Sequence, residues 1–141
     1  MTSDRVARIK RGYEHWNRGE PLPTENVSPD FEFHPPPDLS GESTRRGEGA
    51  GEAFKEGIED AFSVKITLLD TREHGDQIIA HVRVETAGRH TGIEMSREEF
   101  HVYSFEGRLL RSIRCFVAEE DADAAAREHQ GSDPLHQRGD R

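Results

Sequence analysis

Large apolar residues near the N-terminus recur at the spacing of an amphipathic helix. They fall at Val6, Ile9, Tyr13 and Trp16. Charged residues fill most positions between them, so the apolar side chains share one helical face. Gly19 is suited to the left-handed conformation that ends a helix, and the prolines after it prevent continuation. The pattern predicts a first helix that runs from about Val6 and ends near Gly19.

A short strand and a second helix are predicted next. Residues 31–34 alternate as Phe-Glu-Phe-His and then meet three prolines, which cannot donate ladder hydrogen bonds. The strand should therefore stop near His34. A loop rich in Gly, Ser, Glu and Arg covers residues 38–51, and an apolar helical stripe follows it at Phe54, Ile58, Ala61 and Phe62.

The pattern then changes to alternation at period two. Four such runs, at residues 64–69, 77–85, 93–105 and 109–117, are separated by short turns that contain glycine. Sequential strands with short connections predict an antiparallel meander. Residues 118–128 are rich in alanine and acid, which predicts a third helix. Helices followed by strands indicate an α+β fold, with the first two helices on the apolar face of the sheet.

Length and composition bound the organisation of the chain. At 141 residues and 16.0 kDa the chain has the size of one domain. We expect this domain to cover residues 1–128. Residues 129–141 contain a single large apolar residue, Leu135, and are predicted to form a flexible tail.

Charge and cysteine content exclude several partner classes. There are 28 acidic and 19 basic residues, a net charge of −9 that repels phosphate backbones. We therefore expect neither a nucleic-acid partner nor a membrane partner. One cysteine cannot form an internal disulfide, and the N-terminus lacks the apolar stretch of a secretory signal. These features predict a cytoplasmic protein.

Two segments resemble a known family. Residues 30–37 (Asp-Phe-Glu-Phe-His-Pro-Pro-Pro) and 101–109 (His-Val-Tyr-Ser-Phe-Glu-Gly-Arg-Leu), in this order of elements, look like the SnoaL-like branch of the nuclear transport factor 2 and ketosteroid isomerase superfamily. The resemblance covers about Val6 to Ala124. It implies a bacterial protein with a cone-shaped fold, in which a curved antiparallel (mixed) sheet packs on about three helices around an internal pocket. It also implies a homodimer that pairs through the outer face of the sheet.

The resemblance implies positions for acid–base groups. In ketosteroid isomerases the general-base carboxylate lies at the end of the first strand before a proline, which here is His34. The protonated acid that binds the oxyanion matches His101, so histidine replaces both carboxylates. An aromatic residue late in the last strand matches Phe116. The phenolic donor of the first helix is approximated by Tyr13.

Histidine at these positions suits proton transfer. An imidazole titrates near pH 6.5, so it can accept a proton at neutral pH without a large pKa shift. His34 is the candidate base, because the following proline fixes its backbone as extended. The alternative is a strand-end histidine that only hydrogen-bonds a neighbour. His101 is expected to polarise a carbonyl beside Tyr103, and the alternative is a sheet histidine at a subunit interface.

Strand alternation and the resemblance suggest the remaining pocket residues. They place Arg114 inward as an anchor for a carboxylate, enolate or phenolate, with a surface arginine at the dimer rim as the alternative. The pocket wall is expected to include Trp16, Val82, Val84 and Phe116, which exclude water.

Motifs for metals and nucleotides are missing from the sequence. There is no His-Glu-x-x-His, no close pair of cysteine and histidine, and no Gly-Lys-Ser/Thr after the glycines of residues 47–51. We therefore expect no metal and no cofactor. The resemblance, together with the candidate histidines, implies a pocket for a small hydrophobic molecule that carries a carbonyl, and a cofactor-independent isomerase, cyclase, dehydratase or epoxide hydrolase. The alternative is a non-catalytic ligand-binding or dimerisation module.

Overall fold

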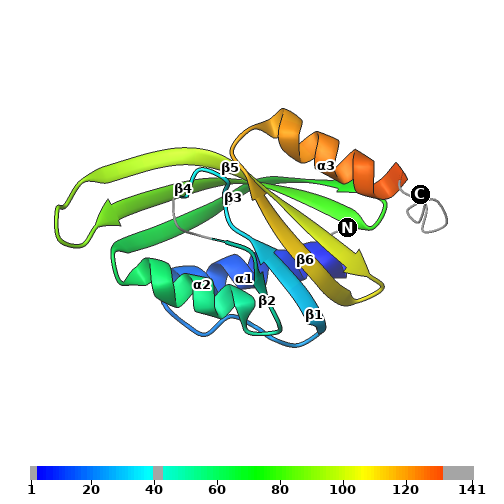
Figure 1. Ribbon diagram of the computed structural model, residues 1–141, viewed down its shortest axis with the longest axis horizontal. Coiled ribbons are helices and arrows are strands. Elements are labelled where there is room, and N and C mark those ends of the chain that lie inside the picture. The colour runs from blue at the N-terminus through cyan, green and yellow to red at the C-terminus, as the bar shows by residue number, and fades with distance from the viewer. Residues whose placement is uncertain (1–2, 40–42, 132–141) are drawn as a thin grey trace.

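The computed structural model describes residues 3–39 and 43–131. A curved sheet carries α1 and α2 on one side and α3 on the other (Figure 1). The helices are α1 (Asp4–Arg18), α2 (Ala50–Glu59) and α3 (Glu119–Gly131). The strands are β1 (Val27–His34), β2 (Arg45–Arg46), β3 (Phe62–His74), β4 (Gln77–Gly88), β5 (Glu94–Glu106) and β6 (Leu109–Phe116).

The sheet has six strands in the order β2-β1-β6-β5-β4-β3. All neighbouring strands are antiparallel except β1 and β6, which are parallel. The run from β3 to β6 is the predicted meander, because short turns join strands that also pair. The α+β prediction of a curved mixed sheet on three helices is confirmed.

The ends of α1 follow from local sequence. The Ser3 hydroxyl accepts a hydrogen bond from the Val6 amide at 3.1 Å, which caps the N-terminus. Gly19 adopts a left-handed conformation with φ of 70°, and its amide donates to carbonyls of the last turn. The predicted apolar face of the helix is buried at Val6, Ile9 and Tyr13.

Several elements differ from the prediction. β1 starts at Val27, where it pairs with β6 beyond the predicted alternation. The strand β2 was not predicted, because its two arginines become a strand only by pairing with β1. α2 ends at Glu59, and Phe62 already begins β3, whose pairing with β4 continues to His74. In each case a partner strand sets the boundary.

The two faces of the sheet bury separate apolar clusters, since strand side chains alternate between faces. The face under α1 and α2 carries the larger cluster, which includes aromatic residues of β1, α2 and β5. The face under α3 carries a smaller one, formed by Ile79, Phe100, Val102, Ala122 and Ala126. The larger cluster is not solid, and the cavity described below lies within it.

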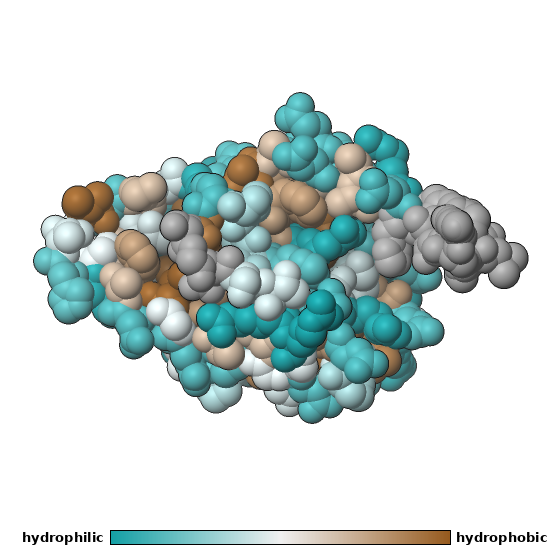
Figure 2. Space-filling view, in the orientation of Figure 1, coloured by the Kyte–Doolittle hydropathy of each residue, from teal (hydrophilic) through white to brown (hydrophobic). Residues whose placement is uncertain are grey.

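The two most exposed large apolar side chains of the described residues lie at the end of the molecule formed by the long strands. Ile93 and Met95, in the β4–β5 hairpin, are 64% and 63% exposed. Figure 2 shows hydrophobic surface gathered toward this end, on the left of the view, and hydrophilic surface over most of the rest.

Within the described ranges, no helix is both long and apolar enough to cross a membrane. The predicted tail at residues 129–141 overlaps the end of α3, whose backbone continues to Gly131. Its remaining residues, from 132 onward, lie outside the described residues.

Candidate functional site

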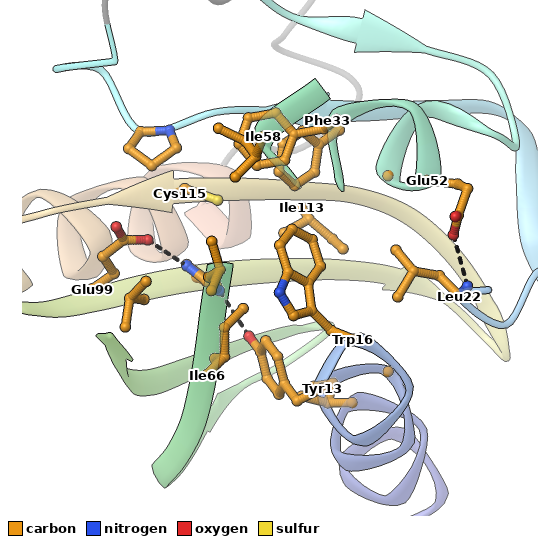
Figure 3. Close-up of a pocket in the computed structure, with 18 of the residues that line it drawn as sticks. Tyr13, Trp16, Leu22, Phe33, Glu52, Ile58, Ile66, Glu99, Ile113 and Cys115 are labelled. Carbon is orange, nitrogen blue, oxygen red and sulfur yellow. Dashed lines mark hydrogen bonds and ion pairs between the residues drawn. The ribbon is translucent and has the colours of Figure 1, made fainter. Parts of the chain in front are cut away.

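A cavity of about 420 Å³ lies between the concave face of the sheet and the helices α1 and α2. This volume is within the range of small-molecule sites. Its wall is mainly apolar, and Figure 3 shows side chains from helices and strands converging on it. The larger apolar lining residues include Ile9, Trp16, Leu22, Phe31, Phe33, Phe54, Ile58, Ile66, Val84, Leu110 and Ile113.

The strand β5 supplies more of the polar lining groups than any other element. Four alternate residues of β5, at positions 97, 99, 101 and 103, line the cavity. They are Arg97, Glu99, His101 and Tyr103. Residues two apart on a strand share a face, so the sequence itself aligns these side chains in a row.

These side chains form a buried hydrogen-bond chain with α1 (Figure 3). His101 Nε2 lies 2.9 Å from Glu99 Oε1, and His101 Nδ1 lies 2.8 Å from the Tyr13 hydroxyl. The Tyr13 hydroxyl is also hydrogen-bonded to Tyr103, whose ring meets it edge-on at a centroid distance of 6.2 Å. The chain therefore joins β5 to α1 across the cavity.

The opposite end of the chain reaches the surface. Arg97 Nε donates to Glu99 Oε2 at 2.9 Å. Its terminal Nη2 donates to Asp38 Oδ1 at 3.1 Å, and Asp38 belongs to the loop after β1. Asp38 and Arg97 are partly exposed, whereas Glu99 is buried. Polar groups thus connect solvent to the floor of the cavity.

Burial and pairing decide the charges of this chain. Burial disfavours protonated His101, but contact with Cys115 and the bond to Glu99 outweigh it and raise the pKa of His101 to about 10. Burial likewise opposes the charge of Glu99, yet hydrogen bonds from His101 and Arg97 hold its pKa below the ordinary value. At neutral pH the pair is therefore an imidazolium and a carboxylate.

The two tyrosines remain neutral donors. Burial raises the pKa of both Tyr13 and Tyr103. A protonated His101 donates through both ring nitrogens, so the Tyr13 hydroxyl accepts from Nδ1 and donates to Tyr103. The proton of the Tyr103 hydroxyl is then left to donate to an oxygen in the cavity.

Several predicted pocket residues do line the cavity. Tyr13 and Trp16 reach it from α1, Val84 from β4, and His101 and Tyr103 from β5. The structure brings three of them together directly, because Tyr13 bonds both His101 and Tyr103.

Val82 is placed differently from the prediction. It is fully buried and packs in the core cluster of the same face, but it is not a lining residue.

His34 lies away from the cavity lining. Its Nε2 is 3.0 Å from Glu32 Oε1, and its Nδ1 is 3.0 Å from the Thr44 hydroxyl. Alternation explains the placement, because Phe31 and Phe33 point inward and line the cavity, so His34 shares the other face with Glu32. The structure therefore does not bring His34 and His101 to a common site.

The placement predicted for Arg114 and Phe116 requires a correction. A bulge in β6 pairs Phe105 with Leu110 but Ser104 with Ser112, so Arg111 is an extra residue. The extra residue reverses the alternation, and the lining residues after it are Ile113 and Cys115. Phe116 instead packs in the cluster under α3, and Arg114 donates to the Ala125 carbonyl of that helix at 3.4 Å.

The sequence analysis did not assign site roles to Arg97, Glu99 and Asp38. Arg97 and Glu99 lie four and two positions before His101 on the same strand, so their shared face is a signal that could have identified them. Asp38 has no such signal, since it is 59 residues from Arg97 in the chain. Residues 3–39 and 43–131 contain no group of three or more His, Cys, Asp or Glu that could hold a metal ion.

Comparison with known proteins identifies the fold. No protein-family model matches the chain, and no curated protein sequence matches it. Solved structures do match. An NTF2-like protein of unknown function from Burkholderia pseudomallei is 17% identical with a TM-score of 0.72, covering 85% of this chain and 95% of its own. A putative polyketide cyclase from Xanthomonas campestris pv. campestris is 13% identical with a TM-score of 0.68, covering 86% and 95%.

A ketosteroid isomerase is also similar. The Delta 5-3-ketosteroid isomerase from Mycobacterium sp. is 17% identical with a TM-score of 0.64, covering 86% of this chain and 97% of its own. Identities this low carry the fold and not the activity. The curved mixed sheet, the three helices and the structural matches therefore give this chain the fold of the NTF2-like proteins, a fold that it shares with a putative SnoaL-like polyketide cyclase and a ketosteroid isomerase.

Proposed function

We propose that the cavity binds a small apolar molecule through one carbonyl-type oxygen and promotes cofactor-independent proton transfer on it. The observation that carries the proposal is the buried chain from Glu99 through His101 and Tyr13 to Tyr103. It ends in a hydroxyl donor inside an apolar cavity.

The chain suits a developing negative charge. A carbonyl that becomes an enolate gathers charge on its oxygen, and fixed donors in a water-poor site stabilise that charge strongly. The Tyr103 hydroxyl would contact the oxygen. His101 would act through Tyr13, because its positive charge makes the phenol chain a better donor. In this arrangement His101 is a positioning and polarising group, and it is not the base. The proton that leaves the carbon would pass to a water molecule in the cavity and from there to solvent.

The similar folds agree with this class of chemistry. The proteins named above include one described as a putative polyketide cyclase and a ketosteroid isomerase. Isomerisation, cyclisation, dehydration and epoxide hydration all require an oxygen to be polarised, and the site offers a donor for that purpose.

A second candidate is ligand binding without turnover. It is favoured by the placement of His34, which hydrogen-bonds Glu32 and Thr44 outside the cavity. Two cavity carboxylates, Asp38 and Glu99, are held by Arg97 and have lowered pKa values, which makes them weak bases.

Benzylacetone, a neutral phenyl ketone, separates these candidates. Binding is followed by the fluorescence of Trp16, the single tryptophan, which lines the cavity. We expect Tyr103→Phe to weaken binding about tenfold, the size of one lost hydrogen bond to a buried acceptor. His34→Gln serves as the control and should bind like the wild type. Equal affinity in wild type and Tyr103→Phe would refute the assigned donor.

The same ketone tests catalysis. In deuterated water, enolisation exchanges the protons next to the carbonyl, and NMR measures the rate. Exchange that the protein accelerates and that Tyr103→Phe slows supports the enzyme. Binding without accelerated exchange supports the second candidate.

A further inference from the structure

The face of α1 that lines the cavity carries a second donor group. Arg8, Ile9, Gly12, Tyr13 and Trp16 all line it, a spacing that places them on one helical face. Arg8 extends along this face over Gly12, where an added Cβ would meet Arg8 Nη1 at 3.7 Å. The glycine thus leaves room for the guanidinium at the cavity wall.

The guanidinium of Arg8 has no carboxylate partner in the described part of the chain. Its Nη2 donates to the Pro23 carbonyl at 3.2 Å, and its Nε is buried with no hydrogen-bond partner there. The carboxylate whose charge favours protonated Arg8 belongs to Glu25, which is already held by Arg11 at 2.7 Å. Burial lowers the pKa of Arg8, which reflects a charge that is only partly compensated.

The other charged groups of the lining are neutralised or exposed. Arg97 pairs with Asp38 and Glu99, and Glu99 also pairs with His101. Glu52 Oε2 forms an ion pair with Lys55 Nζ at 3.6 Å. Glu48 is exposed to solvent. Arg8 is therefore a cationic lining residue whose charge the described protein does not balance with an ion pair.

We propose that Arg8 binds an anionic carboxylate of the ligand, so that the cavity selects apolar acids over neutral molecules of the same shape. A guanidinium is planar and presents parallel N–H donors that match the two oxygens of a carboxylate. The apolar wall accommodates the hydrocarbon body of the ligand. The Tyr103 hydroxyl donates a hydrogen bond to another oxygen of the ligand. The inference rests on the proposed binding function, because it names the substrate class of the same cavity.

The test compares two ligands of one skeleton. Hydrocinnamate and benzylacetone differ in that a methyl ketone replaces the carboxylate, and Trp16 fluorescence reports the binding of each. We expect the wild type to bind hydrocinnamate about tenfold more tightly, as a charged hydrogen bond contributes about 1.5 kcal/mol or more. Arg8→Gln should abolish this preference and leave the affinity for benzylacetone unchanged.

Two further variants sharpen the result. Lys10→Gln removes the same charge from an exposed position of α1 and should keep the preference. Arg8→Lys keeps the positive charge but lacks the planar guanidinium, and it should retain part of the preference for hydrocinnamate. This variant and the wild-type comparison decide the question if Arg8→Gln does not fold.

The outcomes distinguish the two proposals. Equal wild-type affinity for acid and ketone, or a preference that survives in Arg8→Gln, overturns the role of Arg8 and leaves the proposed function standing. Binding of neither ligand overturns the proposed function, and the inference falls with it.

Discussion

Two histidine–glutamate pairs of nearly equal geometry lie in very different surroundings. His34 and Glu32 in β1 are 3.0 Å apart, and His101 and Glu99 in β5 are 2.9 Å apart. In both, the histidine follows the glutamate by two positions, so strand alternation makes the pair. The side chains of the β1 pair are 35% and 34% exposed, whereas those of the β5 pair are 7% and 8% exposed.

The two pairs differ in how much water surrounds their charges. Each glutamate also bonds an arginine: Glu32 bonds Arg46 of β2, and Glu99 bonds Arg97 of β5. Water screens the exposed set, so its charges interact weakly. The buried set has lost that screening, and its charges depend on each other. Burial, and not the contact itself, gives the β5 pair the strong charge interaction on which the proposed function rests.

The largest difference is expected on removal of the carboxylate charge. Glu99→Gln leaves a buried imidazolium without its counter-charge and should lower the free energy of unfolding by about 3 kcal/mol. Glu32→Gln removes a half-exposed carboxylate and should cost less than about 1 kcal/mol. Urea unfolding measures both. Equal losses in the two variants would show that burial does not distinguish the pairs.

The pH dependence of stability sharpens the comparison further. Unfolded histidine titrates near pH 6.5, and the pKa of folded His101 is about 10. Between these values the native state holds a proton that the unfolded state has lost. Rising pH should therefore lower stability there, by up to about 1.4 kcal/mol per pH unit. Urea unfolding between about pH 7 and pH 9 measures this slope.

The two histidine variants are the controls for that slope. His101→Gln should remove it, whereas His34→Gln should retain it. A slope that persists in His101→Gln would mean that another group is responsible.

The smallest effect is expected at the arginines. Arg97→Gln frees Asp38 and removes one of the two cationic partners of Glu99, and it should cost about 1 kcal/mol. Arg46→Gln, at a mostly exposed side chain, should cost only a few tenths of a kcal/mol. Thermal unfolding of both variants measures the difference, and a larger loss for Arg46→Gln would contradict the proposed ranking.

Local pattern was sufficient for the three helices, for every strand except β2 and for one face of the site. The helical spacing of α1 predicted a buried stripe that includes Tyr13, and alternation on β5 put His101 and Tyr103 on one face. Both inferences hold because helix and strand periods follow from backbone geometry within a few residues.

The remaining site residues could not be placed in this way. A bulge at Arg111 reversed the faces of Arg114 and Phe116. His34 lies on the outer side of β1 because Phe31 and Phe33 occupy the inner side. The partner strand decides where an extra residue is accommodated, and the core decides which face of a strand points inward. The residues that form the partner strand and the core are distant in the sequence.

The sequence by itself determined the periods of the helices and strands, the sign of the net charge and the placing of His34 and His101 on the same strand face as the glutamate two positions before. Only the tertiary structure decided which pair is buried, since burial depends on the helices that close over the sheet. The tertiary structure also decided the contact between Tyr13 and His101, which lie 88 residues apart in the chain. Neighbours along a chain are fixed by covalent geometry, whereas the loss of water around a charge requires the assembled fold.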